Sequence, residues 1–288
     1  MTSTPRRRPA RRYLAAVVAA VIAVVVGVAV SATAGSSPAN MSATDRVKAH
    51  PPPQLFSDAQ VFTARGSVDA QAATASRLMR SWWKVHGTTV DDTAFLAWVE
   101  TQLPAPPSAA VRRDEMREVK ALDARRTPAG VAAASWLEAY GKKDVWKLYA
   151  HDQRELLSAK TGKADKAELK LILKMAKTAA DALGTKDQQS APYVIDPTLR
   201  PDHTVKPGQV CPCSYPSRHA ARAAGARTFL GTLSPHRLAD YRWMEGQIDF
   251  SRLYMAGHVQ SDLDAGALLG DMIGQYVLVT RGHLAMPS

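Results

Sequence analysis

Two short segments in the last third of the 288-residue chain carry most of the side chains that could do chemistry. The first reads Cys211-Pro-Cys-Ser-Tyr-Pro-Ser-Arg-His219, and the second reads Ser251-Arg-Leu-Tyr-Met-Ala-Gly-His-Val-Gln-Ser-Asp262. Imidazole and carboxylate groups transfer protons or attack electrophiles, and guanidinium groups bind oxyanions. The combination therefore favours acid–base or nucleophilic chemistry on an anionic substrate.

The first segment predicts the start of a helix. Pro216-Ser217 precedes the alanine-rich run 220–231, which places Ser217 near the helix cap. The free amides of such a helix start favour an anion such as phosphate. His219 lies in the first turn, so we expect it to face the same anion.

The second segment predicts a second anion-facing helix start. His258 and Asp262 are four residues apart, so on a helix they share a face, and Asp262 would hold the imidazole in one tautomer. Gly257 offers a break, so we expect one helix to end near residues 252–253 and another to begin at His258. Arg252 and the new helix start would then converge on one phosphate. Taken separately, each of these residues also has an ordinary structural interpretation, as a surface residue, a structural histidine or a helix pair, and that interpretation is the more common one.

The elements that must position these residues are predicted to be helices. From about Ser67, apolar residues recur at spacings of three and four. Helix starts are predicted at Asp91 or Asp92, Ser108, Thr127-Pro128 and Asp144, and residues 165–183 form an amphipathic helix. The aromatic residues at helical spacing are interpreted as core. Because the one β-like run, 193–195, is too short for a sheet, the predicted fold class is all-α, a helical bundle.

The N-terminal region has the composition of an export segment. Residues 1–34 join an arginine-rich head, an apolar run over 14–30 and a small-residue end, which is typical of a signal peptide, with an uncleaved signal anchor as the alternative. Residues 35–62 are interpreted as a flexible Pro/Ser-rich linker, and residues 63–288 as the helical domain. We therefore expect an exported protein, periplasmic, in the cell envelope or extracellular, whose only membrane contact is an uncleaved N-terminal segment.

Charge and cysteine content argue against a nucleic-acid-binding protein and against a zinc site. The formal net charge is +11, and five arginines lie within the first twelve residues. The remaining basic residues are spread along helices without an arginine-rich or aromatic–basic motif, so no nucleic-acid partner is predicted. Cys211 and Cys213, the only two cysteines, are interpreted as loop residues, either reduced or in a strained disulfide. No second Cys pair or nearby His cluster completes a zinc site, so no metal site is predicted.

The two segments resemble the type 2 phosphatidic acid phosphatase superfamily, which includes class A non-specific acid phosphatases and vanadium-dependent haloperoxidases. The pattern Ser-Arg-x5-His-x3-Asp fits completely at Ser251, Arg252, His258 and Asp262. The pattern Ser-Tyr-Pro-Ser-x-His fits except that Arg218 stands where the family has glycine. The resemblance covers about residues 165–281, and an all-helical fold agrees with it.

The family's first motif, a lysine followed by Arg-Pro, is where the sequence departs. Residues 191–197 are similar to the Arg-Pro segment with Ala191 in place of arginine, and Lys186 is then the candidate lysine. An alternative frame uses Arg200-Pro201 but puts Tyr193 at the lysine position, so we prefer Lys186. Arg218 either replaces the lost positive charge or plugs the pocket.

The resemblance implies a mechanism. His258 would attack phosphorus to form a phosphohistidine, oriented by Asp262, and His219 would protonate the leaving group and then activate water. Phosphate would be bound by Arg252, Ser217, Lys186 and Arg218. No cofactor is expected, except vanadate if the chain is haloperoxidase-like, and the partner is a small phosphorylated substrate. Three functions remain open: an exported phosphomonoesterase, a vanadium haloperoxidase, or a catalytically weakened anion-binding homologue. The sequence leaves the oligomeric state undetermined.

Overall fold

The computed structural model describes residues 41–155, 159–200 and 213–285. The chain divides into two units, residues 1–50 and 51–288. The predicted export segment, residues 1–34, lies outside the described residues. None of the helices in the described ranges combines the length and apolar character that a membrane crossing requires.

Of the first unit the structure describes one helix, α2 (Ala43–Ala49), which begins where the Oγ of Ser42 accepts the amide of Asp45 at 3.1 Å. In the second unit, α3 already begins at Asp58, because Ser57 and Gln60 form a capping box. Helical structure therefore extends into residues 43–62, which the sequence led us to interpret as a linker.

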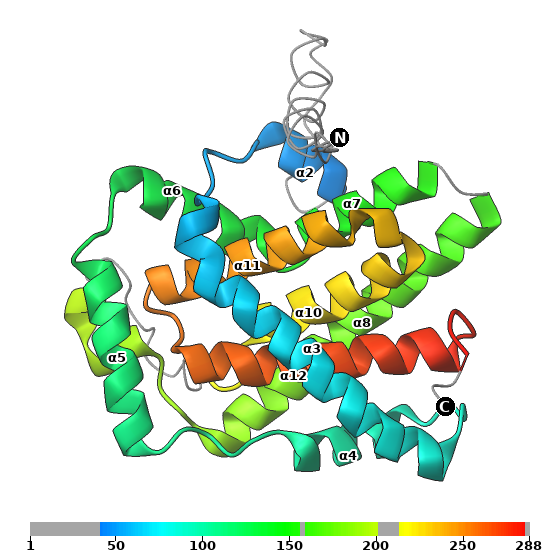
Figure 1. Cartoon of the computed structure of the whole chain (residues 1–288). Helices are drawn as coiled ribbons and strands as arrows, with labels where there is room; N and C mark the ends of the chain where they lie inside the picture. Colours follow the sequence, from blue (N-terminus) through cyan, green and yellow to red (C-terminus); the bar gives the residue numbers. More distant parts are fainter. Residues whose placement is uncertain (1–40, 156–158, 201–212, 286–288) are drawn as a thin grey trace, which may run out of the picture. The chain divides into compact units, whose positions relative to one another are not determined.

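All regular structure of the described residues in the second unit is helical (Figure 1), and Ser190 and Cys213 form one isolated antiparallel bridge. The all-α prediction is confirmed. The elements are α3 (Asp58–His86), α4 (Asp92–Gln102), α5 (Ala109–Asp123), α6 (Pro128–Trp136), the π-helical turn η2 (Leu137–Gly141), α7 (Asp144–Glu155), α8 (Ala159–Asp187), α9 (Pro192–Ile195), the 3₁₀ turns η3 (Pro197–Leu199) and η4 (Pro235–Arg237), α10 (Arg218–Leu233), α11 (Leu238–Tyr254) and α12 (Gln260–Thr280).

Most helix starts lie where the capping residues predicted them. Asp91, Ser108 and Thr127 each cap a helix with their side chains, and Pro128 occupies the first position of α6. The aromatic residues interpreted as core are buried, including Trp82 and Trp146. Local capping chemistry and apolar spacing therefore explain the N-terminal half of the helical unit.

Helices α10 and α12 form the centre of the second unit, and α3, α8 and α11 pack around them (Figure 1). Three glycines of α12, at positions 266, 270 and 274, lie against α10. A Cβ at Gly266 would stand 2.4 Å from the carbonyl oxygen of Ser217, and one at Gly270 would stand 2.1 Å from that of Ala221. Because these contacts advance in the same direction along both helices, α10 and α12 run parallel. Their N-termini, which carry the two predicted motifs, therefore lie side by side.

A buried ion network links α10, α11 and α12 behind this packing. The guanidinium of Arg227 contacts the carboxylates of Glu245 and Asp271, each at 2.7 Å. These carboxylates raise the pKa of Arg227 despite its burial, so all three polar groups are tolerated in the core. Asp271 thereby has a charged partner in the buried middle of helix α12.

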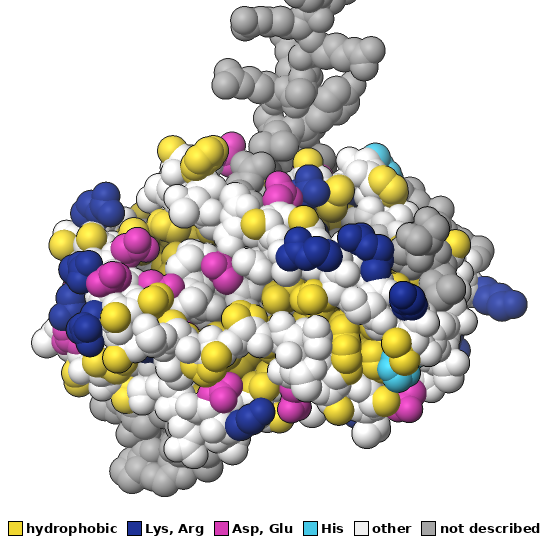
Figure 2. Space-filling model, turned by 60° about the horizontal axis from the view of Figure 1, so that its bottom comes forward, with side chains coloured by type: hydrophobic (Ala, Val, Ile, Leu, Met, Phe, Trp, Pro, Cys, Tyr) yellow, Lys and Arg dark blue, Asp and Glu magenta, His cyan; other side chains and the backbone are white. Residues whose placement is uncertain are grey.

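On the face shown in Figure 2, Lys and Arg side chains are interspersed with Asp and Glu side chains. Among the exposed ion pairs of the described residues, Arg117 of α5 contacts Asp114 at 2.8 Å. Pairs of this kind contribute little to stability, and they keep this face free of a field of one sign.

Candidate active site

His258 lies in the loop between α11 and α12, two residues before α12 begins. Its Nδ1 is 2.9 Å from the backbone carbonyl oxygen of Ser214. A carbonyl only accepts hydrogen bonds, so Nδ1 carries the proton and the lone pair is on Nε2. The neutral ring thus has the tautomer required of a nucleophile at Nε2.

Asp262 is fully buried in the first turn of α12 and caps that helix. Its carboxylate accepts the backbone amide of Val259 at 3.0 Å and lies 3.8 Å from Nδ1 of His258. Burial alone would raise the pKa of Asp262, but His258, Arg112 and the Val259 amide more than offset it and lower the pKa. The carboxylate therefore fixes the loop that carries His258, while the closer contact to the imidazole is the Ser214 carbonyl.

Arg112 of α5 is a residue that the sequence analysis missed. Its guanidinium is buried, contacts Asp262 at 3.3 Å and Ser214 Oγ at 3.0 Å, and also donates to the carbonyl of Ser190. It therefore holds together three segments that are far apart in the sequence. An arginine among the charged pairs of α5 gave no signal of this role, because the pattern of α5 is that of a solvated helix.

One turn later on α5, Glu115 binds the start of α12. Its carboxylate accepts the backbone amide of Ser261 at 2.8 Å and the Ser261 hydroxyl at 2.7 Å. Figure 1 shows α5 beside the loop that joins α11 and α12. Helix α5 therefore clamps the N-terminus of α12 through two adjacent turns.

Ser217 caps α10, as predicted, and joins the two helix starts. Its Oγ accepts the amide of Ala220 at 3.4 Å, and its own amide donates to the carbonyl of Asp262 at 2.7 Å. Both N-termini are therefore held together by a backbone bond. Parallel helix N-termini add their positive ends, which favours a bound anion.

His219 lies in the first turn of α10 and is 8% exposed. Its Nε2 is buried and has no hydrogen-bond partner among the described residues. Burial lowers the pKa of His219 well below its usual value. The positive charges of Arg252, Arg218 and Lys142 lower it further, as does His258 when that ring is protonated. His219 is therefore a neutral imidazole in cationic surroundings, close enough to Arg252 and His258 to respond to their charge.

Arg252 is buried in the last turn of α11, at 3% exposure. Its guanidinium donates to the carbonyl of Ala134 at 3.2 Å and to the hydroxyl of Ser251 at 3.1 Å, which fixes its position. It also contacts the carboxylate of Glu138 at 3.2 Å. Glu138 belongs to the π-helical turn η2, a type of distortion that often occurs at functional sites.

Arg200 approaches the same carboxylate, with its Nη2 3.7 Å from Glu138. It lies over the ring of Tyr193 at 5.5 Å, and its charge lowers the pKa of Arg252, after the larger effect of burial. Glu138 is therefore a single negative group between two arginines. Arg200, the arginine of the alternative frame, therefore shares a carboxylate with Arg252.

Two other predicted phosphate ligands, Lys186 and Arg218, have exposed side chains. Lys186 is exposed on the last turn of α8. Arg218 is half-exposed and pairs with Asp181 of α8 at 3.1 Å. Lys142, which the sequence analysis did not single out, follows η2. Burial lowers its pKa, and its charge lowers the pKa of His219.

Ala191, the residue interpreted as a lost arginine, is buried at the start of α9. Its segment is tied to the loop of His258, since the amide of Tyr193 donates to the carbonyl of Ala256 at 3.1 Å. Ala256 has a positive φ of 52°, a strained value for alanine. An apolar cluster fastens this loop: Met116, Val119, Leu199, Ala256 and Val259.

The cysteine pair is described only in part. Cys213 is disulfide-bonded, which excludes the reduced alternative for this residue, and Cys211 lies outside the described residues. Ser214, the next residue, is fully buried and donates its amide to the carbonyl of Gln189 at 2.8 Å. The backbone that binds His258 is therefore anchored on both sides.

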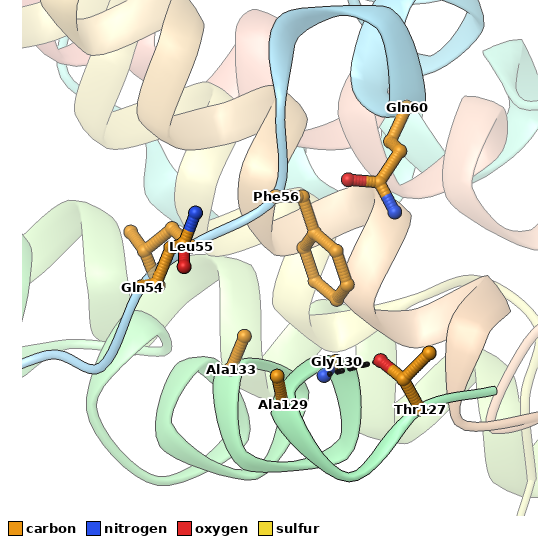
Figure 3. Close-up of a pocket in the computed structure, with 8 residues that line it drawn as sticks. All are labelled: Gln54, Leu55, Phe56, Gln60, Thr127, Ala129, Gly130 and Ala133. Carbon is orange, nitrogen blue, oxygen red and sulfur yellow. Dashed lines mark hydrogen bonds between the residues drawn. The ribbon is translucent and has the colours of Figure 1, made fainter.

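Figure 3 shows a pocket between the segment leading into α3 and helix α6. It is lined by Gln54, Leu55, Phe56, Gln60, Thr127, Ala129, Gly130 and Ala133. The lining has no charged side chain and none of the predicted site residues. It is therefore not the anion site that the two motifs predict.

Comparison of the chain with protein-family models and with curated proteins found no match. The resemblance stated above therefore depends on the short motifs alone. The geometry around His219, Arg252 and His258 is independent of it.

Proposed function

We propose that the chain is an exported acid phosphatase that hydrolyses phosphate monoesters through a phosphohistidine intermediate. The observation that carries this proposal is a pair of histidines with complementary states. Nδ1 of His258 is engaged by a carbonyl, which leaves Nε2 as a nucleophile, and His219 is buried with an unpartnered Nε2. Both lie among cationic side chains and paired helix N-termini.

In the first step the Nε2 lone pair of His258 forms a bond to phosphorus, and the bond from phosphorus to the ester oxygen breaks. The leaving oxygen takes a proton from His219. His219 is neutral in the free protein, and a bound phosphate dianion supplies the negative charge that raises its pKa and allows it to carry that proton.

In the second step the neutral His219 takes a proton from water, whose oxygen attacks phosphorus. The bond from phosphorus to Nε2 breaks, which releases phosphate and restores His258. Arg252, the amides of α10 and α12, Lys142 and Arg218 offset the charge on the phosphoryl oxygens. All groups in this scheme belong to the chain, so we expect activity to persist in a chelator.

A second candidate function is a weakened anion-binding homologue, and Glu138 favours it. Its carboxylate pairs with Arg252 and Arg200, the two arginines that a phosphate would need. An anionic ligand must displace Glu138 or bind beside it against its charge. Strong occupation of the site by Glu138 would leave binding weak and turnover slow.

The deciding experiment is hydrolysis of p-nitrophenyl phosphate and of an alkyl phosphate by the purified chain in EDTA. We expect turnover that vanadate inhibits, that His258→Ala abolishes, and that exposed His236→Ala leaves unchanged. His219→Ala should lose about 10²–10⁴-fold on the alkyl phosphate and less on p-nitrophenyl phosphate, because p-nitrophenolate leaves without a proton.

A base-stable, acid-labile phosphoprotein after rapid quenching would support the phosphohistidine. Equal activity in His258→Ala and the unmutated chain would contradict the proposal. Phosphate binding without turnover would favour the anion-binding homologue, and bromide oxidation with bound vanadate would favour a haloperoxidase.

A further inference from the structure

A second cluster of chemically capable side chains lies where α8 meets the end of α12. Asp165 and Glu168 come from α8, and His283 follows α12. One ligand atom from each lies within 4.8 Å of the other two, and Nε2 of His283 contacts the carboxylate of Glu168. None of these residues takes part in the proposed phosphatase chemistry.

Asp165 is the member that calls for an explanation. It is 6% exposed, and its Oδ1 is buried without a hydrogen-bond partner among the described residues. A buried carboxylate oxygen with no partner is costly unless the group is protonated or a cation or water satisfies it. The positive groups on this turn of α8, Lys163 and Lys166, are exposed to solvent.

The turn after α12 fixes the position of His283. Gly282 has a φ of 81°, its amide donates to the carbonyl of Val279 at 3.2 Å, and the amide of His283 donates to that of Leu278 at 2.8 Å. These two bonds define a Schellman motif, in which glycine supplies the left-handed residue. The ring of Phe229 packs edge-on against His283 at 5.6 Å. The imidazole is thus presented by a defined turn and held by an aromatic neighbour.

The donor set indicates the type of ion. One imidazole and two carboxylates are ligands that Zn²⁺ accepts at about 2.0–2.2 Å, whereas Ca²⁺ and Mg²⁺ prefer oxygen ligands only. Three protein ligands leave one position for water, and solvent can enter because Glu168 and His283 keep side-chain exposures of 17% and 19%. The spacing i, i+3 puts the two carboxylates on one face of α8.

We propose that Asp165, Glu168 and His283 form a Zn²⁺ site that ties the end of α12 to α8. The site lies beyond the opposite end of α12 from Asp262, which for a helix of 21 residues is about 30 Å away. An ion here would join the end of α12 to α8 and so stabilise the fold, and the site does not depend on the proposed phosphatase activity.

The test uses the full chain, stripped with EDTA and dialysed. Isothermal titration with Zn²⁺ should show one ion per chain, and Tm should rise by about 5–10 °C at free Zn²⁺ about 100 times its Kd. Co²⁺ as a probe should give visible absorption typical of low coordination number. Mg²⁺ and Ca²⁺ should leave Tm unchanged.

Asp165→Asn and His283→Gln should each lose the Zn²⁺-dependent rise in Tm, while His236→Ala, an exposed histidine on η4, keeps it. If one variant fails to fold, the other still decides the question. The proposal would be overturned if Asp165→Asn and His283→Gln bound Zn²⁺ as well as His236→Ala does. It would also be overturned if the unmutated chain bound no Zn²⁺. Phosphatase activity measured in EDTA is unaffected by either outcome, which separates this test from that of the proposed function.

Discussion

Glu138→Gln is the substitution that tests the anion site most directly. The carboxylate lies 3.2 Å from Arg252 and 3.7 Å from Arg200. It therefore occupies the position beside the two guanidinium groups that a phosphate would take. Glutamine keeps the length and the helix propensity of the side chain and removes only its charge. The π-helical turn should therefore persist, and the two arginines should become available to a ligand.

The expected magnitude follows from the burial of the pair. The side chain of Arg252 is 3% exposed and that of Glu138 is 36% exposed, so the interaction lies between a surface pair and a buried one. Surface pairs are worth at most about 1 kcal/mol and buried pairs more. We take about 1 kcal/mol as the cost of displacing the carboxylate, which corresponds to about fivefold tighter binding of an anion.

The assay is inhibition of p-nitrophenyl phosphate hydrolysis by phosphate, with direct titration of vanadate as a second readout. Glu138→Gln should lower Ki and Kd for these anions about fivefold. The matched control is Glu118→Gln, which removes an exposed carboxylate on α5 and should leave both constants unchanged. Unchanged or weaker anion binding in Glu138→Gln would refute the reasoning, because Glu138 would then serve to position Arg252 and not to compete with the ligand.

Three further predictions concern stability. Gly266→Ala would place a Cβ 2.4 Å from the carbonyl oxygen of Ser217 and should lower the free energy of unfolding, measured in urea, by about 1–3 kcal/mol. The control is Gly66→Ala, which has nothing within 4 Å and should not destabilise the protein. Equal effects of the two substitutions would contradict the close packing of α10 and α12. Burial raises the pKa of Asp249 well above its usual value, so the stability linked to its proton is complete below about pH 4 and is lost as pH rises through the folded pKa. Asp249→Asn should therefore flatten the decline of Tm as the pH is raised above about 4, and an unaltered decline would be evidence against it. Arg112→Met leaves the buried carboxylate of Asp262 without its cation and should lower the free energy of unfolding by about 3–5 kcal/mol. Adding Asp262→Asn in a double variant should restore part of this loss. Additive losses would show that the two residues are not coupled.

Much of the helical architecture could be predicted because its signals are local. Side chains that cap helices, such as Asp91, Ser108 and Ser217, act within three residues, and apolar spacing reports the buried face of each helix. The break between α11 and α12 was predicted from Gly257, although α11 ends at Tyr254 and α12 begins at Gln260. The boundary moved because Asp262 accepts the Val259 amide and caps the helix from inside its first turn.

For the candidate site too, some residues could be named from the sequence, whereas their contacts required the structure. His219, Arg252, His258 and Asp262 could be named from the sequence, because each motif is a short continuous segment. The sequence could not show that Ser214 holds the imidazole of His258, or that Arg112 stabilises Asp262 across 150 residues. Such contacts join helices that meet only when the chain is folded.

The sequence alone determined the fold class, most of the helix starts and the residues capable of chemistry, because these depend on interactions between near neighbours. Only the tertiary structure decided which cations surround His219, that Glu138 separates two arginines, and that His283 meets α8. The physical reason is that charge and coordination act through space. Their partners are therefore set by how α10 and α12 pack, and not by their distance along the chain.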